Sequence, residues 1–201
     1  MFGVKGFFGT GMAVINLTPG NLLPILPQLE NRKSPVVSFY LDMGMVSRYW
    51  GDERKYHHTV PINMIYALRE ALRIIAEEGL AARFARHRLN HRALVAGVEA
   101  MGLSMLVAED ERLPMLNAIR IPEGADDLKV RKALLNDFAI EIGGGLGDLA
   151  GKIWRVGLMG HSSCGRNVFL FLSALETILK SQGVKVKPGA LEAASSVYEE
   201  A

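Results

Sequence analysis

The sequence predicts a small α+β domain in which helices cover one face of a largely antiparallel sheet, preceded by a long connecting helix. The first observation is the order of hydrophobic patterns after residue 60: a long helix, and then helix, two strands, helix, two strands, helix. The second is the placement of glycine and proline residues between these segments. A chain of 201 residues, 49% hydrophobic and 22% charged, can bury the core that such a domain needs.

The connecting helix is predicted over residues 61–79. Pro61 suits the first turn of a helix, and Gly79 suits the position just after its last turn. Before this helix, residues 36–50 form an apolar and aromatic run that we interpret as a connector packed against a core. Within the helix, apolar residues recur at the spacings of three and four that mark one helix face: Ile65, Leu68, Leu72 and Ile75.

A second helix is predicted over residues 80–101, with Gly102 to end it. His87 and His91 share one face of this helix without a third ligand or an intervening glutamate, so core packing is the favoured interpretation. The same face carries Phe84, Leu94, Val98 and Met101. A solvated helix surface is expected for Arg83, Arg86, Arg88 and Arg92.

The rest of the domain alternates strands and helices. Short apolar runs predict strands at residues 103–107, 117–121, 139–142 and 153–159. Amphipathic patterns predict helices at residues 126–137 and 167–181. Residues 183–201 are predicted to be a loose tail.

Composition argues against several classes of function. The net charge is +2, from 23 basic and 21 acidic side chains, so no large positive field is available to bind nucleic acid or an anionic membrane. One cysteine, Cys164, cannot form an internal disulfide and fits a reducing compartment, which favours the cytoplasm. Glycine and proline interrupt residues 1–29 too often for a signal peptide or a transmembrane helix.

Residues 55–61 place a tyrosine, two histidines and a threonine directly before the connecting helix. Free backbone N–H groups and the helix dipole favour an anion there, and the hydroxyls of Tyr56 and Thr59 can add donors to a phosphate. The alternative is that Thr59 caps the helix and Tyr56 only packs. His57 and His58 are expected to point apart on an extended chain, and no cluster of other ligands accompanies them, so no metal site is predicted.

Arg155 lies within an otherwise apolar segment, residues 153–158. A permanently charged guanidinium is costly at such a position unless an acceptor meets it. A structural ion pair and a position on an edge strand that faces water are two alternatives. The third is bidentate binding of a substrate carboxylate, which the planar guanidinium matches well.

Two loops invite catalytic interpretations that the sequence does not favour. Residues 143–147 are glycine-rich but lack the lysine spacing of a nucleotide-binding loop, so close backbone approach near a ligand, or a strained turn, explains them better. Residues 160–165 contain Ser, His and Cys, yet neighbouring residues of one loop rarely form a nucleophile and base pair. Ser162 or Ser163 is expected to serve near a helix start.

From about residue 31 to residue 180, the sequence resembles the carboxy-terminal portion of class V pyridoxal-phosphate aminotransferases of the alanine-glyoxylate and serine-glyoxylate type. The resemblance implies the small carboxy-terminal domain of a fold type I transferase. Such enzymes move an amino group from a small amino acid, alanine or serine, to the 2-oxo acid glyoxylate, with pyridoxal phosphate as cofactor and two subunits forming each site. The motifs that carry the resemblance, in family order, are residues 32–35, 39–42, 49–51, 55–61, 66–70, 143–147 and 154–158.

The resemblance also implies roles for individual residues. Tyr56 and Thr59 match the tyrosine and threonine that reach the cofactor phosphate of the neighbouring subunit, and Arg155 matches the arginine that binds the substrate carboxylate. Relatives carry the lysine of the resting imine in a Ser/Thr-Gln-Lys segment shortly before Pro-Pro-Gly. Here Ala13 stands at that position, before the Thr-Pro-Gly of residues 18–20.

These matches predict four parts: a poorly matched remnant of the large cofactor-binding domain at residues 1–30, a connector and interface helix at 31–79, the small domain at 80–182, and the tail. Because the imine lysine and most of the large domain are not found, the chain is expected to be truncated and inactive alone. One interpretation is an aminotransferase whose catalytic half lies elsewhere. The other is a non-catalytic domain that associates with a full-length subunit; a homodimer is also expected, but neither nucleic acid nor a membrane.

Overall fold

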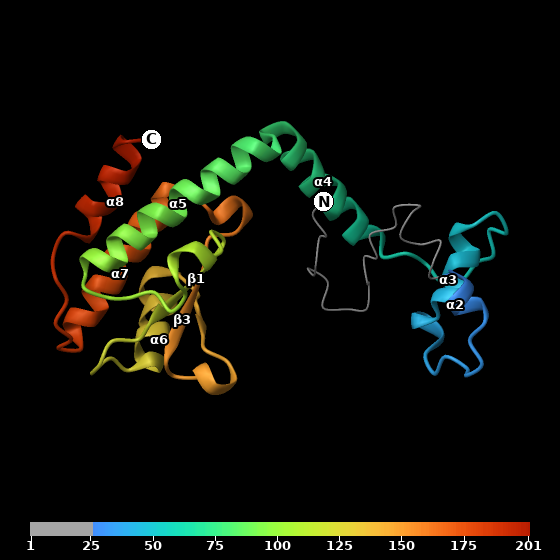
Figure 1. Cartoon of the computed structure of the whole chain (residues 1–201), viewed down its shortest axis with the longest axis horizontal. Helices are drawn as coiled ribbons and strands as arrows, with labels where there is room; N and C mark the ends of the chain where they lie inside the picture. Colours follow the sequence, from blue (N-terminus) through green and yellow to red (C-terminus); the bar gives the residue numbers. More distant parts are fainter. Residues whose placement is uncertain (1–25) are drawn as a thin grey trace. The chain divides into compact units, whose positions relative to one another are not determined.

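The computed structural model describes residues 26–201, and internal contacts divide the chain into two units, Met1–Leu68 and Arg69–Ala201 (Figure 1). Within the first unit, the short helix α2 (Leu26–Glu30) packs beside α3 (Met43–Trp50). The 3-10 turn η1 (Phe39–Leu41) lies between them in sequence.

The segment predicted as a connector contains a capped helix. Asp42 is the N-cap of α3, and its carboxylate accepts hydrogen bonds from the backbone N–H groups of Gly44 and Met45 at 2.9 and 3.1 Å. Val37, in the same segment, is fully exposed, and none of the described residues of η1 is buried. Within the described residues, this segment therefore forms a local structure rather than packing against a large core.

The predicted connecting helix is confirmed as α4 (Ile62–Glu78). Gly79 follows it with φ +82°, a left-handed value that glycine adopts without steric cost, and its N–H bonds the Ile75 carbonyl at 2.9 Å. The apolar face, however, is not covered: among the described residues of α4 none is buried. Its large exposed apolar side chains include Ile62, Ile65, Tyr66, Leu72 and Ile74.

Helix α5 (Leu80–Ala100) is the central helix of the second unit, and it packs against α7 (Gly165–Ser181) and α8 (Ala190–Glu199) (Figure 1). Gly97 allows this close packing, because a Cβ atom there would lie 2.3 Å from Leu172 Cδ1 and 2.9 Å from the Ala190 carbonyl oxygen.

The sheet is antiparallel, with strand order β1-β3-β2, where β1 is Leu116–Arg120, β2 is Gly143–Gly144 and β3 is Ile153–Gly157. One face belongs to the core through Ile119, Trp154 and Val156. That core also contains residues of α5, α7 and α6 (Asp127–Phe138). The prediction of an α+β domain with helices over one face of an antiparallel sheet is confirmed.

The strand predicted at residues 103–107 is wrong. Only Met105 forms a bridge, to Ile119 of β1, with hydrogen bonds on either side at residues 104 and 106. The pairing stops there because the Val107 carbonyl accepts a hydrogen bond from Arg112 Nε at 3.0 Å, and the acidic turn η2 (Glu109–Glu111) carries the chain away.

The strand predicted at residues 139–142 is also displaced, to the glycines of β2. Ala139 has φ +54° and ends α6, and the Ile140 N–H bonds the Leu134 carbonyl at 2.9 Å. The N–H groups of residues 139 and 140 therefore bond a carbonyl in the last turns of α6, and pairing with β3 begins only at Gly143. The 3-10 turn η3 (Gly147–Leu149) joins β2 to β3.

The loose tail predicted for residues 183–201 is wrong, because these residues include α8. Ala190 and Ala194 are buried in the core, and Tyr198 donates a hydrogen bond to Asn90 Oδ1 of α5 at 2.7 Å. Small side chains spaced four apart carry a weak hydrophobic signal, yet they allow helices to approach closely. No helix within residues 26–201 is both long enough and apolar enough to cross a membrane.

Candidate functional site

Tyr56 and Thr59 lie close together on the segment that leads into α4. Their hydroxyl oxygens are 2.9 Å apart, both residues are exposed, and Tyr49 meets the ring of Tyr56 edge-on at 6.0 Å. Thr59 does not act as the simple helix cap of the alternative interpretation. The carbonyl of Pro61 accepts the first helical hydrogen bonds, from the N–H groups of residues 64 and 65, while the hydroxyl of Thr59 bonds to Tyr56.

The prediction that His57 and His58 point apart is wrong. Their Nδ1 atoms are 2.6 Å apart, and His57, only 5% exposed, places Nε2 2.9 Å from the carbonyl oxygen of Phe39. A carbonyl only accepts, so His57 Nε2 carries hydrogen and donates. The side-to-side alternation assumed for an extended chain applies to strands, and the structure has no strand at these residues.

This arrangement fits a phosphate group. Two hydroxyls face one another, and the backbone N–H groups of Ile62 and Asn63 in the first turn of α4 have no acceptor within the described part of the chain. Hydroxyl and free helix N–H donors at a helix amino terminus are the groups that bind phosphate. The fit concerns the phosphate alone, because Ala13, the position predicted to match the imine lysine, lies outside the described residues.

Arg155 lies in β3, the middle strand, so the edge-strand alternative is wrong. Its neighbours across the sheet are Ala118 and Gly143, both small. Its Nε–H donates to the carbonyl oxygen of Gly144 at 2.7 Å. Among the described residues no carboxylate pairs with Arg155, so the alternative of a structural ion pair is not supported there. The guanidinium retains N–H groups for an external acceptor.

A second arginine supports β2 from α6. Arg131 forms two hydrogen bonds to the carboxylate of Asp127, at 2.9 and 2.8 Å, and the buried Trp154 donates its indole N–H to the same carboxylate at 3.0 Å. Hydrogen bonding to Arg131 holds the pKa of Asp127 below its usual value, although burial opposes this shift. Asp127 therefore stays ionised and keeps Arg131 in place.

The arginines predicted to form a solvated surface are partly tied down. Arg83 and Arg86 both bind the carboxylate of Glu78, and Arg86 also donates to the carbonyls of Gly160 and Ser163 at 3.0 and 2.5 Å. The hydrogen bond with Arg86 is the largest cause that lowers the pKa of Glu78 from 4.5 to about 2. These contacts fasten the loop before α7 to α5, which is a structural role.

His87 and His91 were predicted to pack in the core, and both make specific polar links there. His87 Nδ1 donates to the Arg83 carbonyl at 2.7 Å, and its Nε2 accepts from the Gly160 N–H at 3.1 Å, so His87 is the neutral Nδ1–H tautomer. His91 Nδ1 donates to Asn117 Oδ1 at 2.6 Å. Residues 26–201 contain no group of three or more His, Cys, Asp or Glu side chains that could hold a metal ion.

The loop of residues 160–165 includes the 3-10 turn η4 (Gly160–Ser162), and neither of its serines caps α7. Ser163 is fully buried and accepts from Asn90 Nδ2 at 3.2 Å, whereas the Ser162 hydroxyl donates to the Met159 carbonyl at 2.7 Å. Cys164 is the N-cap residue and makes no side-chain capping bond. The expectation that Ser162 or Ser163 serves at the start of the helix is therefore wrong, because their hydroxyls bond Met159 and Asn90 instead.

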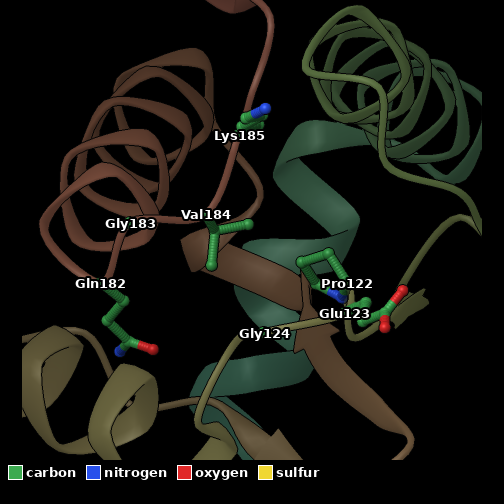
Figure 2. A pocket seen from close by; sticks show the side chains of 7 residues that line it. All are labelled: Pro122, Glu123, Gly124, Gln182, Gly183, Val184 and Lys185. Carbon is green, nitrogen blue, oxygen red and sulfur yellow. The ribbon is translucent and has the colours of Figure 1, made fainter.

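A shallow hollow of about 450 Å³ lies between two turns of the second unit (Figure 2). One turn contains Gly124, and the other, after α7, contains Gly183. Gln182 joins them by accepting from the Asp126 N–H at 2.8 Å. None of the charged side chains that line the hollow is buried. We therefore interpret the hollow as the gap between two turns that Gln182 holds together, and not as a binding site.

The links made by His57 and Asp127 were missed by the sequence interpretation. A histidine doublet beside two hydroxyl residues was visible, but the partner of His57 lies at Phe39, 18 residues earlier. Asp127 was visible as an acidic residue in the first turn of a helix, where such residues are common, and nothing in its spacing indicated Trp154.

No protein-family model matches the chain. Among curated proteins, (S)-ureidoglycine–glyoxylate transaminase of Bacillus subtilis (strain 168) is 44% identical over 168 residues, which cover 83% of this chain and 40% of the relative. Alanine–glyoxylate aminotransferase of Drosophila melanogaster is 36% identical over 179 residues, 84% of this chain and 45% of the relative.

The fold agrees with these similarities. The crystal structure of ureidoglycine–glyoxylate aminotransferase from Bacillus subtilis superposes with a TM-score of 0.79 and 43% sequence identity, covering 85% of this chain and 44% of that structure. The chain thus spans less than half the length of the curated relatives it matches.

Proposed function

This chain belongs to the class V family of pyridoxal-phosphate aminotransferases and matches their carboxy-terminal portion, and we propose that it contributes to a glyoxylate aminotransferase site. In this proposal Arg155 binds the carboxylate of the amino acid or 2-oxo acid. Tyr56 and Thr59 bind the phosphate of pyridoxal phosphate in a neighbouring subunit. The amino donor is a small amino acid such as alanine or serine, and glyoxylate is the acceptor.

The observation that carries the proposal is Arg155, a guanidinium in the middle strand with no carboxylate partner among the described residues. A charged group in a partly buried position is unfavourable unless a hydrogen-bond acceptor or an opposite charge pairs with it, and a bound ligand can supply both. The planar group matches the two oxygens of a carboxylate, which both the donor and the acceptor of a transamination contain. Arg155 would thus bind each substrate in turn by its carboxylate, so that the α-carbon of the amino acid and that of the 2-oxo acid reach the same position.

The phosphate-binding role is supported by the hydroxyl pair of Tyr56 and Thr59 beside the first turn of α4. When bound, pyridoxal phosphate supplies an electron sink for the bonds at the substrate α-carbon. The described residues of this chain would hold the phosphate without taking part in that chemistry. His57 fixes the segment, because its Nε2–H bonds the Phe39 carbonyl and its ring stacks on Phe39 with centroids 4.2 Å apart.

We propose further that these 201 residues do not transaminate on their own, because Ala13 stands where the family has its cofactor-binding lysine. Alanine has no amine to bond the cofactor. The second candidate function is therefore a non-catalytic domain that associates with a full-length subunit. The exposed apolar residues of α4 favour association of this kind, since Ile65 and Leu72 occupy one helix face without being buried.

Complementation tests both parts of this proposal. A full-length class V aminotransferase subunit whose own matching tyrosine and threonine have been replaced would be mixed with this chain, and transamination of alanine with glyoxylate would be measured. We expect activity only in the mixture, with a complex in analytical ultracentrifugation. The chain alone should retain no cofactor absorbance between about 300 and 500 nm after dialysis.

Tyr56→Phe should abolish this rescue, because it removes one of the two hydroxyls. Tyr66→Phe is the matched control, since it removes an exposed tyrosine hydroxyl outside this pair and keeps the aromatic ring that α4 exposes. A complex that forms without activity would leave the docking role and overturn the phosphate-binding role. A cofactor band retained by this chain alone, trapped by borohydride on one lysine, would overturn the inactivity and the assignment of Ala13.

A further inference from the structure

We propose that Gly143 and Gly144 are positioning residues for Arg155, which orient its guanidinium so that only the terminal Nη1 and Nη2 edge faces a carboxylate. The inference rests on the proposed function for the identity of the ligand. The orientation itself depends only on contacts within the second unit.

Gly143 provides the surface on which the guanidinium lies. It is the direct partner of Arg155 across the β2–β3 ladder. A Cβ atom at Gly143 would lie 3.0 Å from Arg155 Nη2, 3.3 Å from Cζ and 3.4 Å from Nε. Three atoms of the group are thus nearly equally close to one point, so the guanidinium lies across this glycine, and even a methyl group would displace it.

Gly144 fixes the rotation of the guanidinium. Its carbonyl oxygen accepts the Nε–H of Arg155 at 2.7 Å. A guanidinium can present two edges to a carboxylate, one formed by Nε with one Nη and one formed by the two Nη atoms. Because Nε–H is already donated to a carbonyl, the first edge is occupied. A carboxylate therefore meets Arg155 end-on.

A second arginine lies beside Gly144. On the other side of β2, a Cβ atom at Gly144 would lie 3.4 Å from Arg131 Nε. Arg131 is itself held by two hydrogen bonds to Asp127, and Asp127 accepts the indole N–H of the fully buried Trp154. The two glycines lie between two guanidinium groups, and the second is anchored to the core.

This arrangement explains why glycine occupies position 143, which backbone conformation does not explain. Neither Gly143 nor Gly144 has a positive φ, so an alanine would be compatible with the backbone at both positions. What an added methyl at Gly143 would disturb is the guanidinium of Arg155. A glycine on the same strand face as Arg155 provides the contrast: at Gly157 the nearest atom to an added Cβ is Met159 Cε at 3.7 Å, an ordinary contact.

The test measures the Arg155 Nε–H signal directly by nuclear magnetic resonance of the whole chain with 15N-labelled arginine. The signal is assigned by its loss in Arg155→Lys. In the wild type we expect slow hydrogen exchange at this N–H, and a shift on titration with oxamate, a small carboxylate that resembles a 2-oxo acid. Gly143→Ala should abolish the slow exchange. It should also raise the half-saturating oxamate concentration about tenfold, as expected if the displaced guanidinium makes one charge-assisted hydrogen bond fewer to oxamate. Gly157→Ala should change neither.

Each outcome decides a separate point. If Gly143→Ala keeps its fold by circular dichroism and also keeps the slow exchange, the positioning role is overturned. If the wild-type N–H already exchanges as fast as that of an exposed arginine, the role is overturned without any variant. If the exchange behaves as expected but oxamate never shifts the signal, the positioning role stands and the proposed carboxylate-binding function of Arg155 fails.

Discussion

Replacing Gly97 by alanine should destabilise the second unit, although alanine is the better helix former. Gly97 lies inside α5, where alanine is favoured over glycine by about 1 kcal/mol. An added Cβ, however, would lie 2.3 and 2.8 Å from the two methyl carbons of Leu172 and 2.9 Å from the carbonyl oxygen of Ala190. Leu172 is fully buried in α7, and the carbonyl belongs to the first residue of α8.

The sign of the effect depends on which neighbour must move. Overpacking by one carbon costs about 1–3 kcal/mol. The Leu172 side chain can rotate only within a closely packed core, and the Ala190 carbonyl can move only if α8 moves with it. Because neither neighbour can move freely, we expect the upper part of this range, about 2–3 kcal/mol. After the gain in helix propensity of about 1 kcal/mol, the net loss is about 1–2 kcal/mol, which corresponds to a fall in Tm of about 3–8 °C for a domain of this size.

Urea unfolding followed by circular dichroism measures this loss, and a second substitution tests its cause. In a Leu172→Ala background, two of the close contacts are removed, so Gly97→Ala should cost less there, by about 1 kcal/mol or more, than in the wild type. If Gly97→Ala stabilises the otherwise unchanged chain, as it would at an unhindered helix position, the close packing of α5 against α7 and α8 is refuted.

Two further predictions concern titratable groups. The pKa of Glu78 is lowered from 4.5 to about 2, first by its hydrogen bond with Arg86, so its stabilising effect is complete above pH 4.5 and is lost as pH falls towards 2. Glu78→Gln should therefore flatten the acid-unfolding profile over that range, and an unchanged profile would contradict the ion pair. Burial raises the pKa of Tyr198 from 10 to about 12, so its contribution is complete below pH 10 and is lost as pH rises towards 12. Absorbance titration should show a late-ionising tyrosine that disappears in Tyr198→Phe; a late step that remains would assign it elsewhere.

The helices were largely predictable from the sequence because their signals are local. Periodic apolar residues and Gly79 located α4 and the start of α5 to within one residue. Helix α6 also lies within one residue of its predicted bounds, and Asp126 caps it by accepting from the Lys129 N–H at 3.0 Å. Helix α8 was missed because its buried face consists largely of alanine, which contributes little to a hydrophobic pattern.

Strands were predicted less well because pairing is not local. The alternation in residues 139–142 is typical of a strand, but the end of α6 uses the first two of these residues. Pairing moved to Gly143 and Gly144, which have low strand propensity and were not predicted to be a strand. The partner that makes this possible is β3, and the register between two strands separated by a glycine-rich loop cannot be read from either strand alone.

At the candidate site, the sequence indicated the groups that we propose to bind a ligand, but not the groups that hold them in place. Arg155 was conspicuous as one charge in an apolar segment, and Tyr56 and Thr59 as hydroxyls before a helix. The acceptors that orient the neighbouring groups are backbone carbonyls, at Phe39 and Gly144. Every residue has a carbonyl, so no residue type in the sequence indicates which one is used.

The use of a carbonyl as the acceptor for Arg155 has a chemical consequence for anion binding. A carboxylate beside Arg155 would orient the guanidinium equally well, but it would also neutralise the charge and compete with a substrate carboxylate. The carbonyl of Gly144 accepts one N–H and carries no net charge, so the attraction for an anion is retained. Arg131 shows the opposite case: Asp127 neutralises it, and it serves β2 as a support rather than as a binding group. The type of acceptor thus distinguishes the two arginines. Arg131, bonded to a carboxylate, holds the fold, whereas Arg155, bonded to a carbonyl, keeps a charge that can bind a ligand.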